Sequence, residues 1–226
     1  ITGAILTHCG VNIDTVSAAV QAAIRGGTPD EALPWVREYI RAGGDQEALA
    51  EAIAAAADGP GRWPGAVSLV DGLGDLDLAL PLRILQARAH LESGAVERAV
   101  LEFDGIMLRS AAFRFDLLAI YEEALARFDG NPTLHLALYH LHLDDDRPVQ
   151  AARHLCRTLE LDPGQIRDVL DRFNALVEAN PTERGLWEEM LAAAVRMGHD
   201  DLARETLRRA VASLPEPDAA ALHIYG

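Results

Sequence analysis

Apolar and polar residues alternate along this chain with the spacing of an α-helix, and short segments rich in Gly and Pro separate the helical runs. Residues 1–60 form a predicted N-terminal helical segment. Residues 61–79 form a linker, which begins as a loop and continues in a stretch where two glycines make the helical pattern ambiguous. The helices predicted in the first segment are 12–27, 28–44 and 45–59.

The pattern becomes more regular from residue 80 onward. Pairs of helices are joined by loops of two to five residues, as antiparallel helical hairpins require, and a third helix follows each of the first two pairs. Residues 80–215 are therefore expected to form helical repeats, and 216–226 a tail without an assigned element. The helices predicted in the repeats are 80–94, 95–109, 114–130, 131–146, 147–164, 165–181, 182–198 and 199–215.

Residues of the same kind recur at an interval of 52 within these repeats. Gly94, Asp146 and Gly198 stand between the two helices of each pair, where a residue in the left-handed region makes a tight turn. A following Ala lets the second helix approach the first closely, so Ala151 and Ala203 are expected to be buried. The other matching positions are Ala99, Ala151 and Ala203, then Phe103, Leu155 and Leu207, and finally Pro163 and Pro215, which end helices.

The last helix pair resembles a tetratricopeptide repeat. That family carries the pattern W-x2-L-G-x2-Y on its first helix, Ala-x3-Phe on its second and Pro at the end. The interval from Pro181 to Pro215 is 34 residues, which is the period of the family. The resemblance is best over 182–215 and weaker toward the N-terminus, where His135 and Arg83 replace the family Trp. The residues that carry it are Trp187, Met190, Leu191, Ala194, Ala203, Leu207, Ala210 and Pro215.

This resemblance implies an all-α fold, a tetratricopeptide-like α-solenoid of about 11–12 antiparallel helices. The 52-residue recurrence departs from the family, because a third helix intervenes between successive pairs. Proteins of this kind are mostly scaffolds that hold a peptide or helix in a concave groove. The resemblance therefore implies binding rather than catalysis.

Composition excludes several classes of enzyme. The chain has no lysine, and all 20 of its basic residues are arginine. P-loop nucleotide hydrolases, Schiff-base enzymes that use pyridoxal phosphate and protein kinases all need a lysine, so none of these functions fits. The net charge of −15 disfavours binding to nucleic acid, which needs clustered positive charge, and is compatible with a basic protein partner.

The two cysteines, Cys9 and Cys156, lie in unrelated contexts and form no Cys-x-x-Cys motif. Reduced thiols, and hence a cytoplasmic protein, are the simplest interpretation. No run of 18 apolar residues predicts a membrane span. Because the chain begins at Ile1, we expect it to be a fragment or a processed product of a longer chain.

The predicted helix at 131–146 is rich in histidine and raises the question of a metal site. His135 and His142 share a helical face, and Asp146, His154 and Cys156 are further residues of the types that bind zinc. The sequence has no His-Glu-x-x-His motif and no paired-cysteine motif. Since His135 also occupies the position of the family Trp, a packing role is expected and no cofactor is predicted.

We expect a non-enzymatic protein–protein interaction scaffold that binds a peptide or helix of a partner protein. The alternative is a helical accessory or sensor domain of an enzyme, in which the His-rich helix binds a metal or a small ligand. Both ends of the chain are apolar, so a homo-oligomer, a partner or further chain is expected to cover one of them.

The resemblance also implies where a partner binds. In the family, the first helix of each pair lines the groove, and the 52-residue interval carries the groove side onto matching positions here. These positions mix charge with apolar bulk, which suits a peptide or helix better than a nucleic acid. The predicted partner-binding residues are Ile84, Arg88, Glu92, Leu136, His140, Asp144, Glu188, Ala192 and Arg196.

Overall fold

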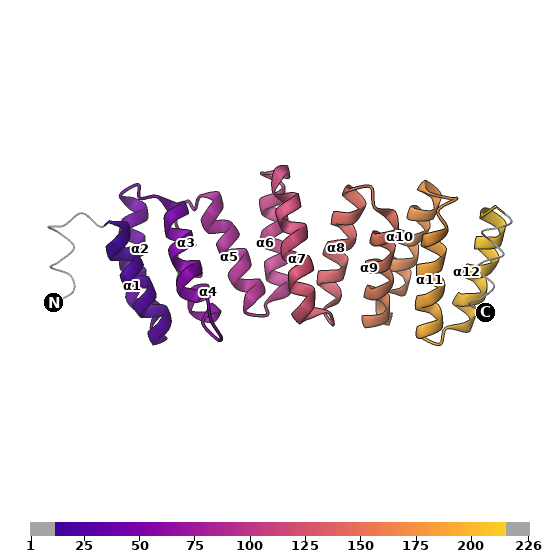
Figure 1. Cartoon of the computed structure of the whole chain (residues 1–226), viewed down its shortest axis with the longest axis horizontal. Helices are drawn as coiled ribbons and strands as arrows, with labels where there is room; N and C mark the ends of the chain where they lie inside the picture. The colour runs from indigo at the N-terminus through magenta and orange to yellow at the C-terminus, as the bar shows by residue number, and fades with distance from the viewer. Residues whose placement is uncertain (1–11, 216–226) are drawn as a thin grey trace. The chain divides into compact units, whose positions relative to one another are not determined.

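The computed structural model describes residues 12–215. Within this range the chain forms twelve α-helices and two short 3-10 helices, and none of these residues forms a strand. The all-α prediction is therefore confirmed. The chain divides into two compact units, Ile1–Phe113 and Arg114–Gly226, which we call unit 1 and unit 2 (Figure 1). No described helix is long and apolar enough to cross a membrane.

Unit 1 is built around one apolar core. Its helices are α1 (Ile13–Gly26), α2 (Pro29–Arg41), α3 (Gln46–Ala57), α4 (Trp63–Asp71), α5 (Leu80–Glu92) and α6 (Val96–Met107), followed by the 3-10 helix η2 (Ala111–Phe113). α1 packs against α2 and α3, and α5 packs against α3, α4 and α6. Val16, Leu49 and Leu69 come from three different helices and are buried together in this core.

Helix α4 begins inside the segment predicted as a loop. Its first residue is Trp63, and Pro64 stands in the first turn, where its fixed φ suits a helix and its missing N–H is not needed. Ala66 and Val70 are buried. Gly72 caps the end of the helix, so the two glycines that made the pattern ambiguous follow α4 rather than interrupt it.

Unit 2 is built around a second apolar core. Its helices are α7 (Arg114–Phe128), α8 (Pro132–Asp144), α9 (Pro148–Leu161), α10 (Ile166–Ala179), α11 (Arg184–Arg196) and α12 (Asp200–Ser213), with the 3-10 helix η3 (Pro163–Gln165) ahead of α10. α9 packs against α8, α10 and α11. The rings of Phe173 on α10 and Trp187 on α11 meet edge to face, with 5.9 Å between their centroids. The third helix of the repeat thereby contributes to the core.

The helices recur at the 52-residue interval predicted from the sequence. α8 and α11 begin 52 and 104 residues after α5, α9 and α12 begin 52 and 104 residues after α6, and α10 begins 52 residues after α7. The structure extends this recurrence into the N-terminal segment, because α2, α3 and α4 begin 51, 50 and 51 residues before α5, α6 and α7. Offsets of one or two residues break the constant interval there, so the sequence alone did not reveal this repeat.

Each turn between paired helices contains a residue in the left-handed region. Gly94, Asp146 and Gly198 have φ angles of 87°, 57° and 69°, and Gly43 takes the equivalent place between α2 and α3 with a φ of 78°. The backbone N–H after each of these residues reaches back five positions and closes the end of the first helix, as in a Schellman motif. In the three predicted turns this bond runs from Ala95 to His90, from Arg147 to His142 and from His199 to Ala194, each with an N···O distance of 2.9 Å.

Small residues are buried at the contacts between paired helices. Ala99 and Ala151 are fully buried, and so are Phe103 and Leu155 one turn later. Ala203 is only half-buried, so the expectation of burial was wrong for the last pair. Among the described helices, α12 packs mainly against α11, and no following helix covers its other side.

Replacing Ala151 by Leu should lower the free energy of unfolding by about 1–3 kcal/mol, because the contact between α8 and α9 has no space for the added carbon atoms. The same change at half-buried Ala203 should cost less than about 1 kcal/mol. Urea denaturation of both variants measures the difference. An equal loss at the two positions would contradict the packing described here.

Asp146 is the one described residue other than glycine with a positive φ. Asp146→Gly should raise the free energy of unfolding by up to about 1 kcal/mol, because glycine adopts this conformation without a steric penalty. Gly198→Ala should lower it by about 1 kcal/mol, because its φ is strained for alanine even though nothing lies within 4 Å of the added Cβ. Thermal denaturation followed by circular dichroism tests both variants, and shifts of the same sign would refute this role for the turns.

Candidate functional site

Each unit places a polar pair between two paired helices at the same register. His90 on α5 and Glu102 on α6 form this pair in unit 1. His142 on α8 and His154 on α9 form it in unit 2, 52 residues later. His90 and His142 are almost fully buried. A polar group removed from water needs a partner, so these positions are candidates for chemistry.

In unit 1, Asp71 at the end of α4 is the centre of a polar network. Its Oδ1 accepts hydrogen bonds from Gln86 Nε2 at 3.0 Å, from His90 Nε2 at 3.1 Å and from Arg98 Nη2 at 3.1 Å. Glu102 Oε1 lies 3.2 Å from Arg98 Nε and 3.4 Å from His90 Nε2. Burial raises the pKa of Glu102, and the nearby His90 and Arg98 oppose this rise. One histidine and one arginine thus bridge two carboxylates.

In unit 2, three histidines form a cluster between α8 and α9. His135 Nε2 lies 2.8 Å from the carbonyl oxygen of Asp129, so this nitrogen carries a proton and donates. In the neutral ring His135 Nδ1 then accepts, and its donor is His154 Nδ1 at 3.0 Å. The rings of His142 and His154 stack with 5.2 Å between centroids. His142 Nδ1 is buried without a hydrogen-bond partner among the described residues.

Burial keeps the three imidazoles of this cluster neutral. It lowers the pKa of His154 from the usual 6.5 to about 4, and the neighbouring His135 and His142 add to the effect. Burial also lowers the pKa values of His135 and His142. At neutral pH the cluster therefore acts as a packed, internally hydrogen-bonded part of the core.

The candidate metal ligands do not converge on one point. Asp146 forms the exposed turn after α8, and Cys156 is a buried free thiol whose pKa is raised by that burial. Within residues 12–215, no group of three or more His, Cys, Asp or Glu side chains is arranged to hold a metal ion. His135 is buried at the position that Trp187 occupies in the last pair. Cys9 lies outside the described residues.

The predicted partner-binding residues lie on α5, α8 and α11, the first helix of each pair. All of them keep part of their surface accessible. In unit 2, helix α10 contacts one of these residues, because Arg172 Nη1 lies 2.8 Å from His140 Nε2. The exposed members are Arg88, His140, Asp144 and Arg196. The half-buried members are Ile84, Glu92, Leu136, Glu188 and Ala192.

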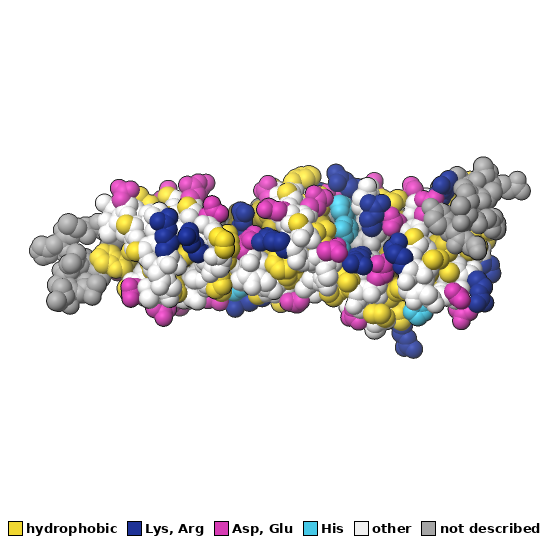
Figure 2. Space-filling view, turned by 60° about the horizontal axis from the view of Figure 1, so that its bottom comes forward, with side chains coloured by type: hydrophobic (Ala, Val, Ile, Leu, Met, Phe, Trp, Pro, Cys, Tyr) yellow, Lys and Arg dark blue, Asp and Glu magenta, His cyan; other side chains and the backbone are white. Residues whose placement is uncertain are grey.

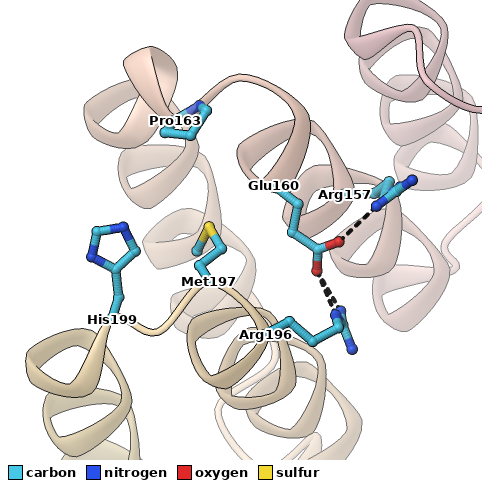
Figure 3. Close-up of a pocket in the computed structure, with 6 residues that line it drawn as sticks. All are labelled: Arg157, Glu160, Pro163, Arg196, Met197 and His199. Carbon is cyan, nitrogen blue, oxygen red and sulfur yellow. Dashed lines mark hydrogen bonds and ion pairs between the residues drawn. The ribbon is translucent and has the colours of Figure 1, made fainter.

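A cavity of about 470 Å³ opens in unit 2 near the ends of α9 and α11 (Figure 3). Glu160 lies on its wall and joins two arginines. Arg157 Nη1 is 3.0 Å from Glu160 Oε2, and Arg196 Nε is 2.8 Å from Glu160 Oε1. The Glu160 side chain is only 9% exposed, so both ion pairs meet at a partly desolvated carboxylate. The other lining residues are Pro163, Met197 and His199.

The two arginines are held in place before any guest arrives. Arg157 Nη2 also lies 3.0 Å from Asp129 Oδ2, and the bonds to Glu160 and Asp129 raise the pKa of Arg157. Arg196 contacts Glu160 through Nε and Nη2, which leaves Nη1 to donate to a guest. On the face seen in Figure 2, basic and acidic side chains are interspersed rather than gathered into a patch of one sign.

Arg196 was predicted as a binding residue from its place on α11, whereas Arg157 and Glu160 were not predicted. They stand three residues apart on α9, and such a spacing is common for ordinary surface ion pairs. Their role becomes visible only when α11 packs against α9 and brings Arg196 to the same carboxylate.

A scan against protein-family models and a search of curated proteins both find no match to this chain.

Acidification should destabilise the protein through the histidine cluster. Unfolded histidine binds a proton near pH 6.5, whereas folded His154 binds one only near pH 4, so between these values the unfolded state binds more protons and stability falls as the pH falls. With an allowance for the partial exposure of His154, its share of the loss from about pH 7.5 to about pH 5.5 should be about 1 kcal/mol. Thermal denaturation at the two pH values measures the loss.

Two variants isolate this effect. His154→Gln retains a donor for His135 Nδ1 and should lose less stability between the two pH values than the wild type does. His199→Gln changes an exposed histidine and is the matched control, which should lose as much as the wild type. An equal pH dependence in all three proteins would exclude His154 as the cause.

Proposed function

We propose that this chain is a non-enzymatic interaction scaffold with tetratricopeptide-like helix pairs, and that it binds a peptide or helix of a partner protein. The cavity of unit 2 carries this proposal, because Arg196 stands there beside Arg157 with both guanidinium groups held by Glu160. Donors that are oriented in advance lose less conformational entropy when a guest binds.

The hairpin geometry supports the tetratricopeptide-like part of the proposal. The paired helices are joined by left-handed turn residues, and small residues such as Ala99 and Ala151 are buried at the contact between them. Trp187 is buried at the position where the family carries its Trp.

The chemistry of the cavity supports a guest that combines an acceptor with an apolar group. Its volume is within the range of about 300–1,000 Å³ that is usual for ligand sites. Arg196 Nη1 suits a carboxylate or a backbone carbonyl, while Met197 and Pro163 offer apolar contact. A peptide with an acidic side chain next to an apolar one meets both requirements.

The lining residues support binding rather than covalent catalysis. They include one histidine, His199, but no Ser, Thr, Cys or Lys nucleophile among the described side chains at the cavity. The carboxylate of Glu160 forms ion pairs with two arginines, so its role is structural.

Selection from a random peptide display library on the purified protein tests the proposal. Arg196→Ala should weaken binding of a selected peptide by about fivefold or more, or about 1 kcal/mol, because it removes the donor to the guest. The loss should shrink at high salt, which screens the contact. Fluorescence anisotropy with the labelled peptide measures both.

Arg204→Ala on α12 is the matched control. Arg204 is exposed and pairs only weakly with Asp201, at 3.4 Å, so this variant should bind like the wild type. The melting temperature of Arg196→Ala should stay close to that of the wild type, since Arg157 still neutralises Glu160. A library that yields no binding peptide, or an affinity unchanged in Arg196→Ala, would contradict the proposed site.

A further inference from the structure

The outer face of α6 carries the two most exposed large apolar side chains among the described residues. Leu101 is 72% exposed, and Leu108 at the end of the helix is 91% exposed. They stand seven residues apart, so they lie on one side of the helix and form a short apolar stripe. α6 packs mainly against α5 in unit 1, on its other side.

The second helices of the other pairs do not carry this stripe. Charged residues take almost all of the equivalent positions, and in unit 2 they form ion pairs with α11, such as that of Arg153 Nε with Glu189 Oε1 at 2.8 Å. The stripe is therefore particular to α6 and is not required by the repeat. The residues at the register of Leu101 and Leu108 are Glu51 and Asp58 for α3, Arg153 and Glu160 for α9, and Glu205 and Ala212 for α12.

Charged residues border the stripe, and its two borders have opposite sign. Glu97 and Asp104 lie on one side of it, and Arg98 and Arg109 lie on the other. Arg98 already holds two carboxylates of unit 1, whereas Arg109 is exposed and forms no ion pair with another described residue. The outer face of α6 thus has an acidic edge, an apolar middle and a basic edge.

Gly105 leaves room between the stripe and the basic edge. In the same column of the 52-residue register, α9 has Arg157 and α12 has Arg209, so α6 lacks the side chain that the later pairs have. Nothing lies within 4 Å of the place that a Cβ would take at Gly105, and a hollow of about 210 Å³ opens there between α5 and α6. At about 30 Å³ per water molecule this is the space of roughly seven waters, which is more than one leucine side chain needs.

We propose that two copies of this chain associate through this face, with their α6 helices parallel about a two-fold axis. Such an axis places the acidic edge of one copy against the basic edge of the other, so that Asp104 meets Arg109 of the second copy. Leu108 of each copy then lies over Gly105 of the other, beside the hollow. Each copy offers the same surface, as a two-fold interface requires.

The charges also decide the direction of the helices. Antiparallel helices about a two-fold axis would bring edges of the same sign together, and like charges across an interface repel. A knob at Leu108 and a space at Gly105 on one helix are complementary to each other, so no further protein is needed to cover the stripe. The interface lies wholly in unit 1 and is independent of the interaction site proposed in unit 2.

Sedimentation velocity of the full chain over a wide range of concentration tests this inference. One helix face buries less than the roughly 800 Å² per partner of a standard interface, so the dimer should be weak, with a Kd of about 10–100 µM. A chain that stays monomeric at about 1 mM would overturn the proposal and leave the stripe to a different protein.

Replacing the stripe locates the contact. The double variant Leu101→Gln, Leu108→Gln keeps the charge and the helix propensity, and should weaken self-association by about tenfold or more. Its melting temperature at low concentration should match that of the wild type, because both leucines are exposed in the single chain. Val211→Gln changes an exposed apolar residue of α12 and is the matched control, which should dimerise like the wild type. Wild-type affinity in the double variant would overturn the proposal.

A charge exchange tests the parallel arrangement. Asp104→Arg and Arg109→Asp each place like charges across the interface, so each variant alone should dimerise about fivefold more weakly or worse. In a mixture of the two variants opposite charges meet again, so the mixed dimer should be tighter than either dimer alone. A mixture that associates no better than its components would overturn the parallel arrangement. Arg196→Ala should dimerise normally, which separates this test from that of the interaction site in unit 2.

Discussion

One residue in the left-handed conformation at the end of the first helix of each pair sets the geometry on which both units depend. Gly43, Gly94, Asp146 and Gly198 hold this conformation, and a Schellman hydrogen bond ends the helix there. In the pairs that begin with α5, α8 and α11, the second helix starts two residues later, so the chain returns antiparallel over a constant length. A constant turn length means that the same two positions face each other in every pair.

Because of that constant register, the same two positions face each other in each of these pairs while their chemistry changes. The facing positions hold His90 and Glu102 in the first of these pairs, His142 and His154 in the second, and Ala194 and Thr206 in the third. Polar groups at a buried register need partners from outside the pair. Asp71 at the end of α4 supplies one for His90, and the carbonyl oxygen of Asp129 after α7 supplies one for the histidine cluster through His135. The third helix of the repeat therefore positions the acceptors as well as closing the core.

The helices and the repeat interval could be predicted because they depend on local patterns, namely apolar periodicity, turn glycines and small residues at the helix contacts. Where several elements had to be considered together, prediction failed. The start of α4 at Trp63 lies in a segment predicted as a loop, and it depends on the burial of Ala66, Leu69 and Val70 against other helices. The burial of Ala203 was predicted wrongly because the 52-residue column indicates which side of a helix faces a neighbouring helix. It does not indicate whether that neighbour is present. Arg157 and Glu160 looked like an ordinary surface pair until α11 added Arg196.

The cavity of unit 2 and the hollow of unit 1 arise from the same property of a repeated scaffold. When the backbone recurs with a constant register, a side chain that changes size or charge in one column alters the surface at a known place while the helices stay where they are. Arg157 fills its column and is fixed by Asp129 and Glu160, so unit 2 presents oriented donors beside a cavity. Gly105 leaves the same column without a side chain, so unit 1 has a hollow of about 210 Å³ between α5 and α6. Because glycine within a helix also weakens it relative to alanine, Gly105 carries a stability cost that packing does not require, since a Cβ would fit there.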